Sequence, residues 1–139
     1  MIIFEGWCVG AKPELSKTLK KPINSLEKLK DKRVVWRYYV NQQLKTKYKA
    51  LYSQLNCIIY LKAENFNLLQ KWRIKQEHKL RLKTKEKTSH KIMNKEAIIN
   101  FMQTYQRITQ NMFKKTPSYA SIILKLNANH QIKSAVYKK

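Results

Sequence analysis

Short apolar runs bounded by turn residues mark four candidate strands along the chain. The first is residues 1–5, which ends at Glu5 and is followed by Gly6. The others are residues 57–61, residues 120–126 and, as an edge strand, residues 131–137. Runs of this length are typical of strands that a parallel sheet buries on both faces. The pattern therefore predicts an opening strand with an acidic side chain at its carboxyl end.

Apolar residues at steps of three and four predict three longer helices between these strands. We expect them over residues 32–54, over residues 65–87, and from an N-cap at Asn94 to about residue 115, where Pro117 stops the last one. The inward face of the first helix is Val35, Tyr39, Val40, Leu44, Tyr48, Leu51, Tyr52 and Leu55.

Two shorter features complete the helical pattern. A helical turn is expected at Asn24 or Ser25, and Asp31 is a plausible N-cap for the helix that follows. Residues 84–91 are polar and charged, which predicts a flexible stretch. The alternation of strands and helices predicts an α/β fold, a parallel sheet flanked by helices, and 139 residues make one domain or part of one.

Composition adds a strong positive charge. The chain carries 30 Lys and Arg against 8 Asp and Glu, a formal charge of +22. Such a balance favours polyanions, so a basic protein that binds nucleic acid non-specifically is the alternative function. The lysines are spread over the whole length, and no recognition helix, zinc finger or RNA-binding pattern accompanies them.

Cysteine and hydropathy patterns narrow the class of protein. Cys8 and Cys57 have no metal-binding spacing and fall in apolar runs, which predicts reduced, buried thiols. No run is long enough to span a bilayer, and no basic region precedes the first apolar stretch as it does in a secretory signal. We therefore expect a cytoplasmic protein with no membrane partner.

Four stretches, in order along the chain, have a distinctive sequence. Residues 4–10 read F-E-G-W-C-V-G, residues 36–44 read W-R-Y-Y-V-N-Q-Q-L, and residues 72–77 read W-R-I-K-Q-E. The fourth stretch contains Phe101, Tyr105, Arg107, Thr109, Pro117 and residues 124–127. Together they resemble the P-loop small-molecule kinases related to D-glycerate 3-kinase: in order, the third-strand motif of that family, its W-R-x-Y-V-N segment, its lid helix, and its closing helix and strand.

The resemblance implies a fold, an activity and roles for particular residues. It implies a P-loop α/β fold with a lid-like helix over about residues 65–91, and phosphoryl transfer from ATP, with Mg²⁺, to a hydroxyl of a small metabolite such as glycerate. Glu5 matches the carboxylate that orients a magnesium-bound water or deprotonates the acceptor. Arg73 and Arg81 match lid arginines that contact phosphates, a task that suits the planar guanidinium. Possible substrate-side residues are Arg37, Gln76 and Glu77.

The chain departs from the family pattern in its first half. It contains no G-x-x-x-x-G-K-[ST] loop, and Asn127 stands where the family usually has an aspartate. The resemblance therefore implies a single partial domain over residues 1–139, with an incomplete parallel sheet that lacks the first strand, the phosphate-binding loop and the second strand. Glu5 and residues 57–61 should flank a gap about two strand spacings wide, ~10 Å. This chain alone should then be inactive, and a separate chain carrying the phosphate-binding loop is a possible partner.

Overall fold

The computed structural model describes residues 1–83 and 92–138 of the chain. Residues 84–91, predicted as a polar stretch at the end of the second helix, lie outside the described residues. The helices and strands, in chain order, are α1 (Ser16–Leu19), α2 (Ser25–Lys30), α3 (Val35–Lys45), α4 (Lys47–Tyr52), β1 (Ile59–Lys62), α5 (Phe66–Lys83), α6 (Lys95–Tyr119), β2 (Ile122–Leu126) and β3 (Ile132–Tyr137).

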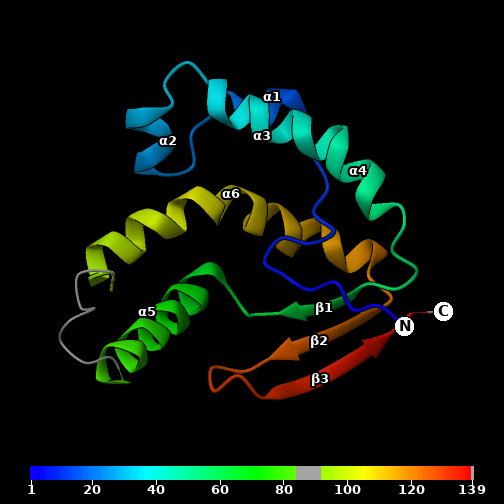
Figure 1. Ribbon diagram of the computed structural model, residues 1–139. Helices are drawn as coiled ribbons and strands as arrows, with labels where there is room; N and C mark the ends of the chain where they lie inside the picture. Colours follow the sequence, from blue (N-terminus) through cyan, green and yellow to red (C-terminus); the bar gives the residue numbers. More distant parts are fainter. Residues whose placement is uncertain (84–91, 139) are drawn as a thin grey trace.

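The three described strands form one mixed sheet in the order β1-β2-β3. β1 and β2 are parallel, with Ile59 opposite Ile122, and β3 returns antiparallel to β2 (Figure 1). The α/β class is confirmed, as are strands close to residues 57–61, 120–126 and 131–137. The turn between β2 and β3 is closed by Asn127, whose side-chain oxygen accepts hydrogen bonds from the amides of Asn129 and Gln131 at 2.9 and 3.0 Å.

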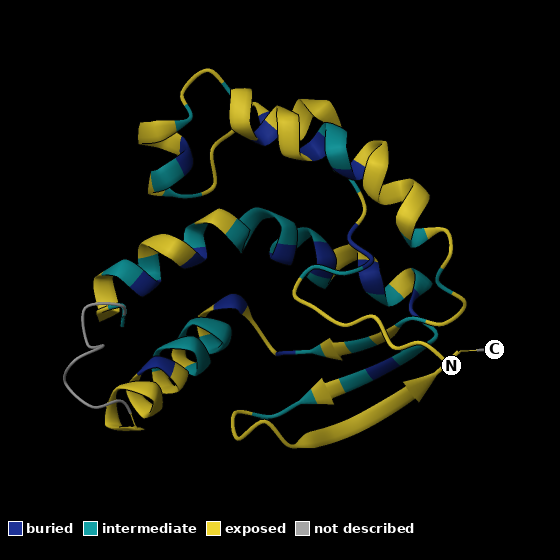
Figure 2. Cartoon of the chain, viewed as in Figure 1, coloured by how far each residue is buried: buried dark blue, intermediate teal, exposed yellow. Residues whose placement is uncertain are grey.

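The predicted opening strand is wrong for the described chain. Residues 1–6 have no assigned strand or helix, and Ile2 is 97% exposed. Figure 2 shows this segment as an exposed trace. A strand exists only when a neighbouring backbone accepts and donates its ladder hydrogen bonds. No neighbour among the described residues does so here, and an apolar run alone cannot supply one.

The helix predicted over residues 32–54 is divided at Thr46 into α3 and α4. Its buried face agrees with the predicted one only in part. Leu44 is buried as predicted, but Val35 and Tyr39 are exposed, and Arg37 and Asn41 are buried instead. The polar residues can be inside because other parts of the chain provide their hydrogen-bond partners, as described below. The N-cap residue is Val34 and not the predicted Asp31, but the Asp31 carboxylate still accepts from the first-turn amides of Trp36 and Arg37 at 3.0 and 3.1 Å.

Helix α6 lies between the sheet and the layer formed by α1 to α4 (Figure 1). Asn94 caps its first turn, as predicted, by accepting from the Ala97 amide at 2.8 Å. The helix continues past Pro117 to Tyr119, because a proline in the last turn removes only one backbone donor. Ala120 closes the helix through a 2.9 Å bond to the Thr116 carbonyl.

The apolar core consists of two clusters along α6. One contains Ala11, Leu44 and Met112, and joins the N-terminal part of the chain to α3 and α6. The other contains Phe66, Ile98 and Met102 and joins α5 to α6. Helix α6 therefore fixes the positions of both the N-terminal segment and α5, which border the candidate site.

Candidate functional site

A cavity of about 1670 Å³ lies between the N-terminal segment, β1 and α5, and we call it the main cavity. Residues 1–9 line one side, residues 54–61 line another, and α5 contributes residues from Leu69 to Lys79. Three of the residues singled out from the sequence line it together: Glu5, Arg73 and Gln76. They come from segments about seventy positions apart, and the fold brings them to one site.

The N-terminal segment is anchored on α6 just beyond Glu5. The indole Nε1 of Trp7 donates to Thr109 Oγ1 at 3.0 Å, and the Trp7 ring stacks on Tyr105 with centroids 5.4 Å apart. The Tyr119 hydroxyl donates to the Gly10 carbonyl at 2.8 Å. Gly10 has a φ of +77°, a conformation that a residue with a side chain rarely adopts. These contacts place Glu5 at the mouth of the cavity without burying its carboxylate.

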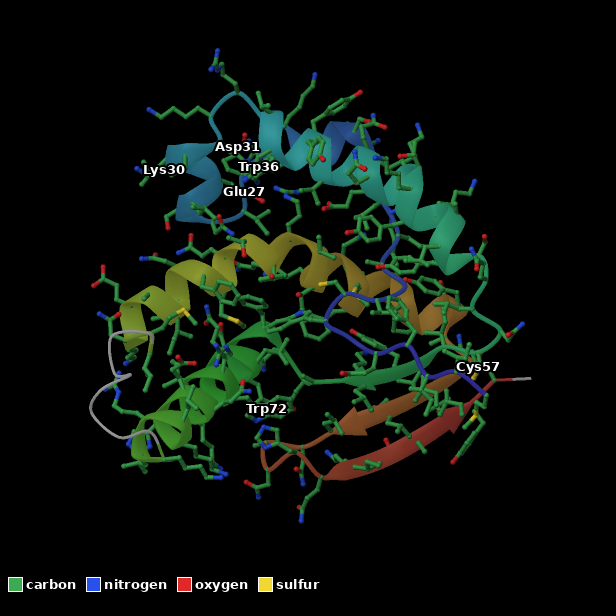
Figure 3. The ribbon with its side chains drawn as sticks, viewed as in Figure 1. Glu27, Lys30, Asp31, Trp36, Cys57 and Trp72 are labelled. Atoms are coloured by element: carbon green, nitrogen blue, oxygen red, sulfur yellow. The ribbon has the colours of Figure 1, made fainter. Side chains whose placement is uncertain are left out.

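The two cysteines differ in their surroundings. Cys8 is half-buried, and burial raises the pKa of its thiol to about 11 despite a contact with Thr109. This thiol therefore stays protonated near neutral pH and is a poor nucleophile. Cys57 is exposed, so the prediction that both thiols are buried is wrong for Cys57 (Figure 3). Both are free cysteines.

Arg73 is held in place by the buried carboxylate of Glu77, one helical turn further along α5. Arg73 Nη1 lies 2.5 Å from Glu77 Oε2 and 3.3 Å from Gln76 Oε1. The other oxygen of Glu77 accepts from the Met93 amide at 2.9 Å. Glu77 thus ties Arg73 to the segment before α6, and a guanidinium held by one edge keeps its remaining N–H groups for another anion.

Arg81 lies away from the main cavity. It is exposed, and its Nη2 reaches the Met93 carbonyl at 3.4 Å. Lys75 and Lys79 line the cavity instead, together with Trp72. Trp72 donates to the Ala128 carbonyl at 2.9 Å and lies against the His130 ring with centroids 4.1 Å apart. Helical spacing in the sequence could have found these lysines, because residues three, four and seven positions beyond Trp72 share its helix face.

Arg37 lies in a different place, at a second cavity of about 590 Å³. Its Nη1 donates to Glu27 at 3.1 Å, its Nη2 donates to the Asp31 carbonyl at 2.8 Å, and its Nε lies 3.1 Å from the Asp31 carboxylate. Arg107 binds both oxygens of Glu27 at 2.7 Å and lies 3.5 Å from Glu14. Figure 3 shows Glu27 and Asp31 beside Trp36 at this end of α2 and α3.

Burial alone would raise the pKa of Glu27, but hydrogen bonds from Arg107, the Ile23 amide and Arg37 hold it below the usual value. The same carboxylate raises the pKa of Arg107. Glu27 and Arg107 are therefore both charged near neutral pH, and each stabilises the charge of the other. The network joins α2, α3 and α6, which explains the buried polar face of α3.

The residues at the main cavity fit part of a magnesium–nucleotide site. Mg²⁺ commonly uses one or two carboxylates and keeps several waters, and Glu5 can supply one carboxylate. Arg73, Lys75 and Lys79 can bind phosphate oxygens. A glycine-rich loop of backbone N–H donors does not fit, because the chain's two glycines are Gly6 and Gly10. In the described part of the chain, no three His, Cys, Asp or Glu side chains gather in a way that could hold a metal.

Comparisons with known proteins found one curated relative and two solved structures of similar fold. No family model matches the chain. A curated protein of Schizosaccharomyces pombe, "Uncharacterized kinase mug58", is 30% identical over 105 residues, which is 75% of this chain and 35% of that protein. The chain thus spans about a third of the length of the curated relative that it matches.

Two solved structures share the fold. D-glycerate 3-kinase from Cryptococcus neoformans superposes with a TM-score of 0.71 at 19% identity, over 97% of this chain and 49% of that one. The YGR205w protein gives a TM-score of 0.57 at 22% identity, over 96% of this chain and 46% of that one. At these identities the two structures show a shared fold. Within residues 1–83 and 92–138, no helix is long and apolar enough to cross a membrane.

Proposed function

We propose that these residues form the C-terminal portion of an ATP-dependent kinase that phosphorylates a hydroxyl of a small metabolite such as glycerate. One observation carries the proposal: Glu5 and Arg73, singled out from the kinase resemblance, line one cavity in a fold shared with D-glycerate 3-kinase. If Glu5 and Arg73 were ordinary solvated surface residues, they would have no reason to lie at the same cavity.

The roles follow from the chemistry of phosphoryl transfer, which depends on positioning and on neutralising charge. ATP with Mg²⁺, when bound, supplies the phosphoryl group and part of the neutralising charge. Glu5, an exposed carboxylate at the cavity mouth, accepts the proton of the acceptor hydroxyl or orients a magnesium-bound water. Arg73 binds phosphate oxygens, and Glu77 is a positioning residue that fixes the Arg73 guanidinium.

These residues alone should not catalyse the reaction. The backbone cradle for the β- and γ-phosphates is not among them, and without it little positioning remains. We propose that a polypeptide segment outside these 139 residues supplies the phosphate-binding loop. The proposal requires only that this segment dock at the main cavity, whether it is covalently joined to these residues or belongs to a separate chain.

A chimera tests this function. These 139 residues replace the matching half of the Cryptococcus neoformans D-glycerate 3-kinase, and ATP-dependent phosphorylation of glycerate is measured for the chimera and for the 139 residues alone. We expect turnover by the chimera and none by the chain alone. Turnover by the chain alone, or an inactive chimera that unfolds as cooperatively as its parent, would contradict the proposal.

Two matched variants locate the chemistry within the chimera. Glu5→Gln should lower kcat by at least about a hundredfold, the usual contribution of a general base. Glu64→Gln removes an exposed carboxylate that does not line the cavity and should leave kcat unchanged. Equal rates for the two variants would remove Glu5 from the proposed mechanism.

A further inference from the structure

The outer side of α3 and α4 carries exposed aromatic rings along its length. Trp36, Tyr38 and Tyr39 of α3 are each more than half exposed, and Tyr48 of α4 is also exposed. We call these four side chains the aromatic face. Figure 2 shows the outer side of α3 and α4 as largely exposed. Single exposed apolar side chains are ordinary on a protein surface, whereas several along one side mark a surface that binds something.

The rings of the aromatic face are arranged for stacking. Trp36 and Tyr39 form a stacked pair, with centroids 5.7 Å apart and planes 24° apart. Further along, Tyr48 lies against Tyr52 with centroids 5.7 Å apart. A flat partner can add to such a pair on its exposed side. Nucleic-acid bases are flat partners of this kind, and every base has a face that can stack on an aromatic ring.

The same stretch of the chain is positively charged and has no acid to neutralise it. Residues 32–63 contain no Asp or Glu. Its exposed cations are Lys32, Arg33, Lys45, Lys47 and Lys49. Within the part of the chain that the structure describes, none of the five forms an ion pair. The surface therefore complements a partner that brings its own negative charge.

Other occupants fit this surface less well. A second copy of this chain would bring the same positive charge to it, since each copy carries +22. A helix that lies on a membrane keeps its charged side chains on the face away from the lipid. Here the opposite face of α3 is buried through Arg37, Asn41 and Leu44, so the cations and the rings share the solvent side. A single-stranded nucleic acid uses both kinds of side chain at once, on its phosphates and on its bases.

Polar groups on α3 favour RNA over DNA. Gln42 and Gln43 lie one helical turn beyond Tyr38 and Tyr39 and therefore share their side of the helix. Side-chain amides and phenol hydroxyls can both donate and accept hydrogen bonds. The 2′-hydroxyl of RNA also donates and accepts, and it is the group by which a protein tells RNA from DNA.

We propose that the outer side of α3 and α4 binds single-stranded RNA without sequence preference. The aromatic face stacks on bases, the cations contact phosphates, and the polar groups of α3 contact the 2′-hydroxyls. The two helices follow one another over Val35–Tyr52 (Figure 1), about 27 Å at 1.5 Å per residue, which matches about eight nucleotides. The inference goes beyond the proposed function, and no residue of the main cavity enters it.

A variant that keeps the charge separates stacking from general attraction to polyanions. The probe is a fluorescein-labelled RNA of about ten nucleotides that does not pair with itself, alone or annealed to its complement, and fluorescence anisotropy is measured at about 100 mM salt. Trp36→Ala should weaken binding of the single strand by at least about fivefold. It should change binding of the duplex by less than about twofold, because duplex bases already stack on one another.

Matched variants control for folding and position. Trp36→Tyr keeps a ring and should restore most of the affinity. Tyr137→Ala removes an exposed ring from β3 and should leave single-strand binding unchanged. Tyr39→Ala tests the same stacked pair if Trp36→Ala does not unfold cooperatively in urea.

The sugar and the phosphates are tested separately. DNA of the same sequence should bind at least about threefold more weakly than the RNA. Replacing Lys45 and Lys47 together by Gln should reduce the slope of log affinity against log salt by about 1.4, since each phosphate contact of a single strand contributes about 0.7. The same change at the exposed Lys125 and Lys133 of β2 and β3 should leave the slope unchanged.

Four results would overturn the inference. The first is an equal effect of Trp36→Ala on single strand and duplex in a variant that unfolds as the native chain does, and the second is equal affinity for RNA and DNA. The third is release from phosphatidylserine vesicles by Trp36→Ala with RNA binding intact, which would make a membrane the occupant. The fourth is loss of RNA binding in the folded chimera, which would make the added half of the kinase the occupant. An inactive chimera that still binds RNA would refute the proposed function alone.

Discussion

Glu27 is a buried carboxylate that links α2 to α3 and α6. It accepts from two guanidinium groups and from the Ile23 amide at 2.9 Å, and it is 7% exposed. Removing one partner of a buried ion pair leaves the other charge without compensation. The network therefore stabilises the packing of α2 on α3 and α6 only while all its members are present.

Glu27→Gln should lower the free energy of unfolding at pH 7 by about 3 kcal/mol, measured by urea denaturation. The pKa of Glu27 is lower in the folded chain than in the unfolded one, so the unfolded chain binds the proton first as the pH falls. The stabilisation is thus complete above the ordinary carboxyl pKa of about 4.3 and is lost as the pH falls through the lower, folded value.

The variant should accordingly show a weaker loss of stability below that pH than the native chain. Glu64→Gln, at an exposed position, is the matched control and should match the native chain at every pH. An equal acid response in the native chain and in Glu27→Gln would contradict the assignment.

Arg73 and Arg81, which the family resemblance assigns the same role, should differ in their effect on activity. In the chimera, Arg73→Ala should lower kcat/KM for ATP by about a hundredfold, because Arg73 lines the cavity and is held by Glu77. Arg81→Ala should change it by less than about threefold, the effect of losing a weak exposed contact. Similar losses in steady-state kinetics would show that the two guanidinium groups act together.

Two residues of the candidate site, Glu5 and Arg73, were predicted from the sequence. Motif spacing placed Glu5 at the end of an apolar run and Arg73 on a helix, and the fold brings both to the main cavity. It could not predict that Arg37 is buried, because the carboxylate that compensates it belongs to the preceding helix. Hydrophobic periodicity counts such a residue as outward-facing.

Among the elements, those that form locally were predicted well and those that need distant partners were not. Helix α6 begins at its predicted cap because Asn94 provides the signal within one turn. Residues 1–5 have a strand-like pattern, yet a strand also needs a neighbouring strand to pair with. The pattern of five residues does not show whether that neighbour is present. The break between α3 and α4 at Thr46 could not be predicted, because no proline or glycine marks it in the sequence.

The helix caps Asn94 and Asn24 should contribute unequally to the free energy of unfolding. Asn94→Ala should cost about 1 kcal/mol in a chemical denaturation experiment, the usual value for an N-cap, and Asn94→Ser should restore most of it. Asn24→Ala should cost more, because Asn24 caps α2 and also donates to the Gln103 carbonyl of α6 at 3.0 Å. A smaller loss for Asn24→Ala would mean that its bond to α6 contributes nothing.

For the whole molecule, the charge of +22 predicts weak binding to any polyanion. Affinity for a random-sequence duplex in a mobility-shift assay should match that for any other duplex and should fall at least about a hundredfold between 50 and 200 mM salt, because binding releases counterions. Binding that prefers one sequence, or that survives moderate salt, would instead favour the nucleic-acid function over the kinase one.

The three tryptophans give the molecule a built-in optical probe. Trp7 and Trp72 both line the main cavity, whereas Trp36 borders the second cavity and is 67% exposed. Replacing Trp36 with Phe would leave two indoles whose emission depends on the solvent around that one site. A shift of this fluorescence to shorter wavelength would then report filling of the main cavity in real time, without any label attached to the chain.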